Sequence, residues 1–405
     1  MVDQALRNSP KVRMSAADVR RAEAGIEETV DAYKPSFLLG SSLGYSYGFP
    51  IGQPEVFSLT AQSLAFSFSQ PDYIRAARKA LQSAQLHLRD TRQQVILDTA
   101  LDYIELAKIQ QQITALDQES GYTHKLIEIE DARVDAGRDA KVELVKARLT
   151  GAQIELKRLH LEDQAEILRA QLAHLTGLSA ADIVPDPRTI PSANPQAQGN
   201  PDAVALGGNS GIQAAYAAAR SKLYTAFGDA RQNNRPTIAF VASYGLFSNF
   251  NNYSQYYLHF QQNNFGAGVQ ITIPLLDSSR TAKAKGSLAD AARSAAEADQ
   301  LRNEAGEQVL QLEKNLSELA LQEQVAELQA ELAQDQLDAV TTQLDSGSGN
   351  ADQSQLTPRD EQQARIEERT RYVDLLDAKF QLAQAQLGLL RSTGKIEDWA
   401  KSPAP

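Results

Sequence analysis

The 405-residue sequence contains no cysteine and no run of 18 apolar residues. The lack of cysteine excludes a disulfide framework and thiol chemistry, and the lack of a long apolar run excludes a membrane-spanning α-helix. Lys and Arg number 40 against 51 Asp and Glu, so the net charge is −11, which argues against nucleic acid as the main partner. The first residues show no basic region followed by an apolar one, so if the protein is exported we expect its leader to be missing from this sequence.

Signals of catalysis are missing as well. The five histidines are scattered along the chain, with no pair at the spacing of metal ligands. The sequence has neither the Ser-containing elbow of hydrolases nor a Gly-rich phosphate loop. We therefore expect no enzyme activity, no cofactor and no metal site.

Proline is absent from two long spans, one between Pro71 and Pro185 and one between Pro274 and Pro358. Because proline breaks helices, these spans can hold long ones. From Val309 to Leu344, ten of eleven positions spaced three and four residues apart are apolar, which is typical of coiled-coil seams. Small alanines and a second apolar stripe favour a barrel of helices, and a plain coiled coil or four-helix bundle is the alternative.

The two halves of the chain carry the same landmarks in the same order. Lys34-Pro35 corresponds to Arg235-Pro236, 201 positions later, and Thr176-Gly177 corresponds to Thr393-Gly394, 217 positions later. Each half reads as a helix, two strands and a long helical hairpin. We therefore divide the chain into repeat one (1–180), a Pro-rich linker (181–208), repeat two (209–394) and a tail (395–405).

Aromatic residues are concentrated in two short stretches, since residues 33–73 and 236–276 hold 18 of the 26 in the chain. Between Ser36 and Pro71 the only charged residue is Glu55, and between Thr237 and Leu276 there is none. Apolar and small polar residues alternate in both stretches, which predicts strands. The expected strands are at about 36–48, 57–70, 237–248 and 264–273, and the helical hairpins that follow them are at about 72–177 and 278–393.

Period-two alternation with aromatic residues on one side is typical of strands in outer-membrane β-barrels. Four strands cannot close such a barrel, and an open sheet edge is not viable in lipid, so several chains are needed, and three would supply twelve strands. A soluble β-sandwich is the alternative. The residues expected to face the membrane are Phe37, Tyr45, Phe66, Phe68, Phe240, Tyr244, Val269 and Ile271.

Basic residues follow each pair of strands, in the first turns of helices, where the helix dipole disfavours them. Phospholipid headgroups would explain their position, and a solvated helix surface is the alternative. The expected headgroup anchors are Arg75, Arg78, Lys79, Arg280 and Lys283.

Four segments carry a resemblance to a known family: "FSFSQPDYIRAARKA", "VQITIPLLDSSRTAKAK", "RVDAGRDAKVELVKARL" and "LLRSTG". Their order across two repeats resembles the TolC-like outer-membrane efflux proteins, also called outer membrane factors. The resemblance implies an α+β membrane protein that forms a homotrimer, with a 12-stranded β-barrel continued by a 12-helix coiled-coil α-barrel.

The resemblance also implies a function. Such a protein would be a passive exit duct of a tripartite efflux or type I secretion system, in the bacterial outer membrane and extending into the periplasm. Its partners would be a periplasmic adaptor, an inner-membrane pump and outer-membrane lipid, with no nucleic acid. The alternative is a periplasmic coiled-coil adaptor or structural protein.

The resemblance assigns two further sets of residues. The periplasmic constriction of the family carries acidic residues, which corresponds to Asp360 and, in the first repeat, to Glu143. A second acidic position of the family is Gln363 here, and Asp360 could instead be the first-turn acid of a helix that starts at Pro358. The adaptor-docking tips of the helical hairpins correspond to Arg133, Gly137 and Gly347.

Overall fold

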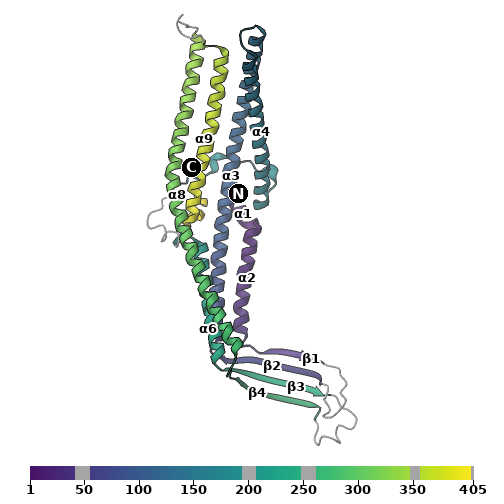
Figure 1. Cartoon of the computed structure of the whole chain (residues 1–405). Helices are drawn as coiled ribbons and strands as arrows, with labels where there is room; N and C mark the ends of the chain where they lie inside the picture. Colours follow the sequence, from purple (N-terminus) through teal and green to yellow (C-terminus); the bar gives the residue numbers. More distant parts are fainter. Residues whose placement is uncertain (42–54, 194–206, 248–260, 347–355, 403–405) are drawn as a thin grey trace. The chain divides into compact units, whose positions relative to one another are not determined.

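The computed structural model describes residues 1–41, 55–193, 207–247, 261–346 and 356–402. It consists mostly of long helices with one small sheet (Figure 1), as the sequence predicts. The helices are α1 (Val2–Asn8), α2 (Pro10–Asp31), α3 (Gln70–Asp135), α4 (Lys141–Thr176), α6 (Ser210–Asn234), α8 (Ser278–Ser346), α9 (Pro358–Ser392) and α10 (Ile396–Ala400), with short 3₁₀ turns η1 (Ala180–Asp182) and η2 (Pro187–Thr189). The strands are β1 (Ser36–Gly40), β2 (Glu55–Ser67), β3 (Thr237–Phe247) and β4 (Asn263–Thr272).

The chain divides into two compact units, and each combines matching segments of both sequence repeats. Unit one consists of Met1–Met14, Arg89–Ser210 and Arg302–Pro405, and unit two consists of Ser15–Leu88 and Gly211–Leu301. The long helices α3 and α8 contribute residues to both units. The units therefore do not coincide with the two repeats, because α3 of repeat one and α8 of repeat two each contribute to both units.

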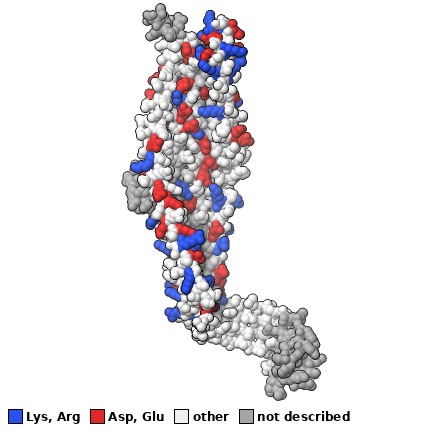
Figure 2. Space-filling model, in the orientation of Figure 1, with Lys and Arg blue, Asp and Glu red and all other residues white. Residues whose placement is uncertain are grey.

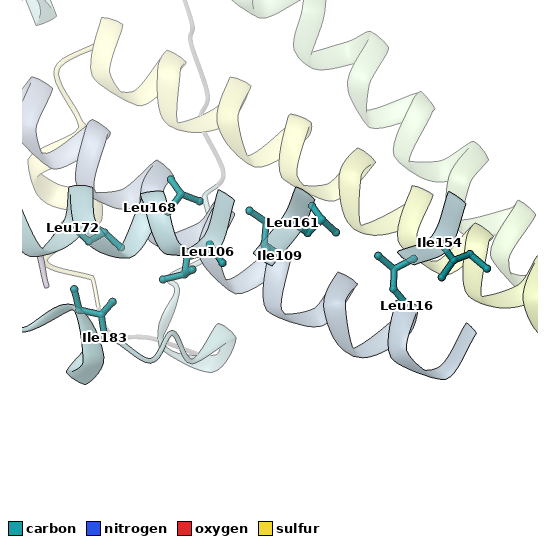
Figure 3. Packing of buried hydrophobic residues seen from close by; sticks show 9 residues of the cluster. Leu106, Ile109, Leu116, Ile154, Leu161, Leu168, Leu172 and Ile183 are labelled. Atoms are coloured by element: carbon teal, nitrogen blue, oxygen red, sulfur yellow. The ribbon is translucent and has the colours of Figure 1, made fainter. Parts of the chain in front are cut away.

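Unit one contains the two helical hairpins. Leu106, Ile109 and Leu116 of α3 pack against residues of α4 in a buried cluster (Figure 3). The residues from α4 include Ile154, Leu161 and Leu168, which are seven apart, as in a coiled coil. A second cluster packs α3 against α9 and α10 and consists of Ile96, Ala100, Leu387, Leu390, Ile396 and Trp399.

Two helices of unit one are followed by a glycine in the left-handed backbone conformation. Gly177 comes directly after α4 with φ +74°, and Gly394 comes directly after the C-cap residue of α9 with φ +73°. A left-handed residue at this position closes the last turn, and glycine adopts it without strain. The two Thr-Gly landmarks of the sequence repeat are thus helix stops.

Unit two contains the sheet, whose order is β1-β2-β3-β4 with all neighbours antiparallel. The predicted strand at 36–48 is described only as far as residue 41, so its second half lies outside the described residues. Among the described helices of the molecule, none is long and apolar enough to cross a membrane.

Candidate functional site

The register of the sheet decides which side chains share a face, because directly paired residues on antiparallel strands point to the same side. Each row of partners crosses the strands. One row joins Leu39, Leu59, Tyr244 and Phe265, and another joins Phe66, Ile238 and Ile271. Phe37 and the Phe240–Val269 pair belong to this same face, which we call the apolar face. Six of the eight predicted membrane-facing residues thus share one face.

The other two predicted residues need separate mention. Tyr45 lies outside the described residues. Phe68 follows the end of β2, and its ring makes an edge-to-face contact with Phe66 at 4.9 Å between centroids.

A β-bulge in β2 keeps the apolar face continuous. Leu64 pairs with Ala239 and Phe66 pairs with Ile238, so β2 has one extra residue, Ala65, at this point. An extra residue switches the alternation, so odd-numbered residues contribute to the apolar face before the bulge and even-numbered ones after it. The sequence analysis therefore missed Phe57 and Leu59, although the change of parity between these residues and Phe66 is visible in the sequence.

The opposite face of the sheet is formed mainly by small, uncharged residues. It presents Gly245 and Ser243 of β3 beside Gly266, Gly268 and Gln270 of β4. The larger apolar residues on this face are Leu38, Leu64 and Val241, of which Leu38 is exposed. Glu55 is the only charged residue in the four strands. The visible surface of the sheet in Figure 2 carries no Lys, Arg, Asp or Glu. The sheet therefore separates an apolar face from a polar, uncharged one.

Both edges of the sheet are open in the single chain. Among the described strands, β1 pairs only with β2, and β4 pairs only with β3. Every residue of β4 is exposed. Such edges present unpaired backbone N–H and C=O groups, which are a template for pairing with another strand.

A network of buried carboxylates lies among the helices of unit two. The side chains of Asp72 and Asp229 are only 1% and 2% exposed. Arg75 and Arg231 form ion pairs with Asp72, and Asp229 accepts hydrogen bonds from Tyr73 at 2.7 Å and Lys283 at 2.9 Å. The network joins α3, α6 and α8.

The pKa values of this network follow from these contacts. Burial acts to raise the pKa of Asp229, but hydrogen bonds from Ser287, Lys283 and Tyr73 outweigh it and hold that pKa below its ordinary value. Burial, followed by the hydrogen bond to Asp229, raises the pKa of Tyr73. Asp229 is thus an ionised, fully bonded carboxylate, as a buried charge has to be.

The predicted headgroup anchors have partners within the chain. Arg75 pairs with Asp72 at 3.1 Å, Lys283 pairs with Asp229, and the Nε of Arg280 lies 3.0 Å from Asp277. Two anchors make no ion pair of this kind: Lys79 donates to Gln82 at 2.8 Å, and the side chain of Arg78 is exposed. The sequence could not reveal the pair of Lys283 and Asp229, which lie 54 positions apart, whereas Arg75 and Arg280 pair with residues three positions before them.

The tip of the first helical hairpin is a tight turn. Gly137 has φ +69° with open space around it, and the guanidinium of Arg133 pairs with Asp139 across the turn. Arg133 therefore closes the tip as well as presenting a charge on it. Gly347, the corresponding glycine of the second hairpin, lies outside the described residues.

The predicted constriction residues lie near the tip end of the helical hairpins. Arg359 of α9 bridges two carboxylates, with its Nε 2.9 Å from Glu130 and its Nη2 3.1 Å from Glu143. This bridge ties α9 to α3 and α4. Hydrogen bonds from Lys146 and Arg359 hold the pKa of Glu143 below its ordinary value.

Asp360 caps α9. Its Oδ2 accepts hydrogen bonds from the backbone N–H and the hydroxyl of Thr357, both at 2.7 Å, in a capping box. Pro358 occupies the first turn. The helix-start role of Asp360, which the sequence left as an alternative, is therefore present in the structure.

Residues 1–178 match the profile of a family described as outer membrane efflux protein. The matched region covers α1 to α4 together with β1 and β2, so it includes one apolar strand pair and one helical hairpin. This match covers less than half of the chain and makes its first 178 residues similar to outer membrane efflux proteins.

Solved structures of outer-membrane channels share the fold of the whole chain. The Campylobacter jejuni CmeC outer membrane channel superposes with a TM-score of 0.77 at 14% identity, over 99% of this chain and 88% of that one. Vibrio cholerae VceC gives 0.74 at 17% identity, over 97% and 95%. The open-state Neisseria gonorrhoeae MtrE outer membrane channel gives 0.69 at 14% identity, over 97% and 88%. Comparison with curated proteins finds no significant match.

Outer membrane efflux proteins are passive channels of the bacterial outer membrane that extend into the periplasm, and they are not enzymes. The expected fold is thereby confirmed, and these matches support the expected family, location and non-enzymatic role. Structurally similar channels are trimers that work with adaptor and pump partners.

Proposed function

We propose that three copies of this outer membrane efflux protein form the exit duct of a tripartite efflux or type I secretion system. The observation that carries the proposal is the pair of open edges on a sheet with one apolar face. An apolar face fits lipid, but no sheet edge can remain open there. Pairing β4 of one copy with the β1 edge of the next removes every edge, and three copies give twelve strands.

The helices of unit one support the same closure. An exposed apolar stripe runs along α4, and a second one runs along α8. The stripe on α4 comprises Val142, Val145, Leu149, Leu156, Leu159 and Ile167, and the stripe on α8 comprises Leu321, Val325, Leu328 and Leu332. Both have coiled-coil spacing. Two different surfaces that bind each other are a heterologous interface, which closes into a ring when the rotation is right.

Lipid would surround the closed sheet. Phe37, Phe66, Phe240, Val269 and Ile271 are exposed on the apolar face, and the uncharged opposite face would line the water-filled interior. The cations Arg75, Arg78, Lys79, Arg280 and Lys283 would lie at the level of the headgroups, where Arg75, Arg280 and Lys283 also hold carboxylates of their own chain.

The opposite end of the duct would meet the periplasmic adaptor. The tip at Arg133 and Gly137 supports this docking role, because the left-handed Gly137 exposes backbone on a turn. Glu143 and Asp360, both close to the tip, would contribute three acidic copies each to a narrow passage that prefers cations.

Export measurements test the proposal. In cells that lack their own duct and contain the matching pump and adaptor, the wild-type chain should restore export of the pump's substrate. Gly137→Val should lower export while the heat-modifiable trimer remains, because a β-branched residue with positive φ costs roughly 1–2 kcal/mol. The control is Gly121→Val, since Gly121 is equally open but lies inside α3 without positive φ.

Two results would contradict the proposal. Export by Gly137→Val at the wild-type rate would remove the docking role of the tip. Recovery of the wild-type chain in the soluble periplasmic fraction would replace the duct with the adaptor or structural protein that the sequence left open.

A further inference from the structure

Arg235 lies at the helix–sheet junction of unit two, between α6 and β3. Its guanidinium lies over the ring of Phe68, 5.5 Å from the centroid. Within the described part of the chain, no carboxylate forms an ion pair with Arg235, whereas Arg75, Arg280 and Lys283 each have one. Its side chain is exposed. Arg235 therefore carries a charge that no carboxylate of the described residues neutralises.

The sheet register places Arg235 at one end of the apolar face. Thr237 pairs with Ser67 on one side and with Thr272 on the other, and these are the last pairs at this end. Phe68 and Ile273 follow directly beyond these pairs, and Arg235 lies two residues before Thr237, beyond Pro236. Aromatic and cationic residues of membrane proteins gather at this level, where the apolar region meets the headgroups.

An apolar segment extends the strand beyond this end. Leu275 is 87% exposed and Leu276 is 100% exposed, directly after Ile273 and Pro274. Large side chains that are this exposed indicate an interaction surface when they are contiguous. The segment follows β4 at the end of the sheet where Arg235 precedes β3, so this end combines one positive charge with apolar contact area.

We propose that Arg235, Phe68 and the segment from Ile273 to Leu276 bind a phospholipid of the leaflet that faces the periplasm. A guanidinium stacked on an aromatic ring keeps its N–H edge available, and that edge matches the oxygens of a phosphate. The apolar segment contacts the acyl chains, which a free phosphate lacks. This inference rests on the proposed function, because it requires the apolar face to lie in lipid.

The first repeat supplies a natural comparison. Lys34 is the counterpart of Arg235 in the repeat, and both precede a proline and a strand. Lys34 pairs with Asp31 at 2.7 Å. Its charge is therefore already compensated, so we expect no equivalent lipid site around Lys34.

Lipid retention tests the inference. The full-length assembly, purified in mild detergent with phosphatidylglycerol, is analysed by native mass spectrometry for bound lipid. Arg235→Gln should lower the affinity about fivefold, which is the effect of about 1 kcal/mol for one arginine near an anionic surface. Lys34→Gln should retain lipid as the wild type does. The double variant Leu275→Ser, Leu276→Ser should also lose lipid, with Arg235 intact.

Several results would overturn the inference. Equal retention by wild type and Arg235→Gln would do so, as would equal loss in Lys34→Gln. Displacement of the lipid by millimolar inorganic phosphate would show that only an anion is bound. A weaker assembly with unchanged lipid in Arg235→Gln would mean that Arg235 contacts a second copy. Failure of the wild type to form a membrane assembly would instead refute the proposed function, and fractionation detects that outcome separately.

Discussion

Three aspartates of the chain show how strongly a carboxylate depends on its surroundings. Asp229 is buried with three hydrogen-bond donors and stays ionised. Asp360 caps α9 through Thr357. Burial, together with the neighbouring charges of Asp98 and Glu105, raises the pKa of Asp102 in α3 to about 6. One residue type thus serves as an anchor, as a helix start and as a group that titrates near neutral pH.

Asp102 makes the stability of the protein depend on pH. Its pKa is higher in the folded chain than in the unfolded one, so ionising it costs free energy in the folded state as the pH rises toward and through 6. Asp102→Asn removes this cost. We expect the variant to have a higher Tm than the wild type at pH 8 and nearly the same Tm at pH 4, in thermal unfolding followed by circular dichroism. An equal difference in Tm at both values would contradict the assignment.

Asp360 has a cap role in the structure and a proposed role in ion selection, and one substitution separates them. Asp360→Asn keeps an oxygen acceptor for Thr357 but removes the charge, so the free energy of unfolding should fall by no more than about 1 kcal/mol. If three copies of Asp360 form an acidic ring, the variant should prefer cations less in single-channel recordings of the reconstituted assembly. An unchanged cation preference would contradict the acidic ring and leave Asp360 with its capping role alone.

Among the elements, the sheet offers neighbouring positions with opposite surroundings. Ile271 lies on the apolar face and Gln270 on the polar face of the same strand. Ile271→Asp should block outer-membrane assembly, because a charge that faces lipid costs roughly 1–4 kcal/mol depending on depth. Gln270→Asp should assemble normally, and the heat-modifiable band on a gel measures both. Equal assembly of the two variants would mean that the apolar face does not face lipid.

The bulge and the ion pairs mark the limit of what the sequence alone could predict. Alternation is local, so the apolar strands and their outward residues could be predicted from a few neighbouring positions. Ser67 also alternates as a polar-face residue, yet it is buried and bonded to Ser69. Whether a side chain such as Lys283 is free or paired depends on Asp229 of another helix. Such contacts are set by tertiary packing, which periodicity does not contain.

Heptad spacing had the same limit for the helices. It is present in the seam of Ile154, Leu161 and Leu168, which is buried against α3. It could not tell this seam from the stripe of Leu149 and Leu156 on the same helix, which is exposed. Both have apolar residues seven apart. Only the packing of α4 within unit one separates a seam that is filled by the chain itself from one that awaits another copy.

At the scale of the whole molecule, each unit has surfaces that a single chain leaves uncovered. Unit two has two open sheet edges, and unit one has two apolar helix stripes. One ring of identical chains would cover all four surfaces. In such a ring the β4 edge of each chain pairs with the β1 edge of the next, and the α4 stripe packs against the α8 stripe. The account therefore depends on the number of chains in the ring.

Native mass spectrometry of the wild-type protein, extracted from the outer membrane in mild detergent, measures that number directly. The account predicts one dominant species with three times the polypeptide mass of 44.2 kDa, apart from bound lipid and any covalent modification. Leu156→Glu places a charge in the exposed stripe of α4 and should shift the protein toward single chains, whereas Gln153→Glu, at another exposed position of α4, should leave the trimer intact. A wild-type protein that is monomeric, or that closes with a different number of copies, would contradict the account.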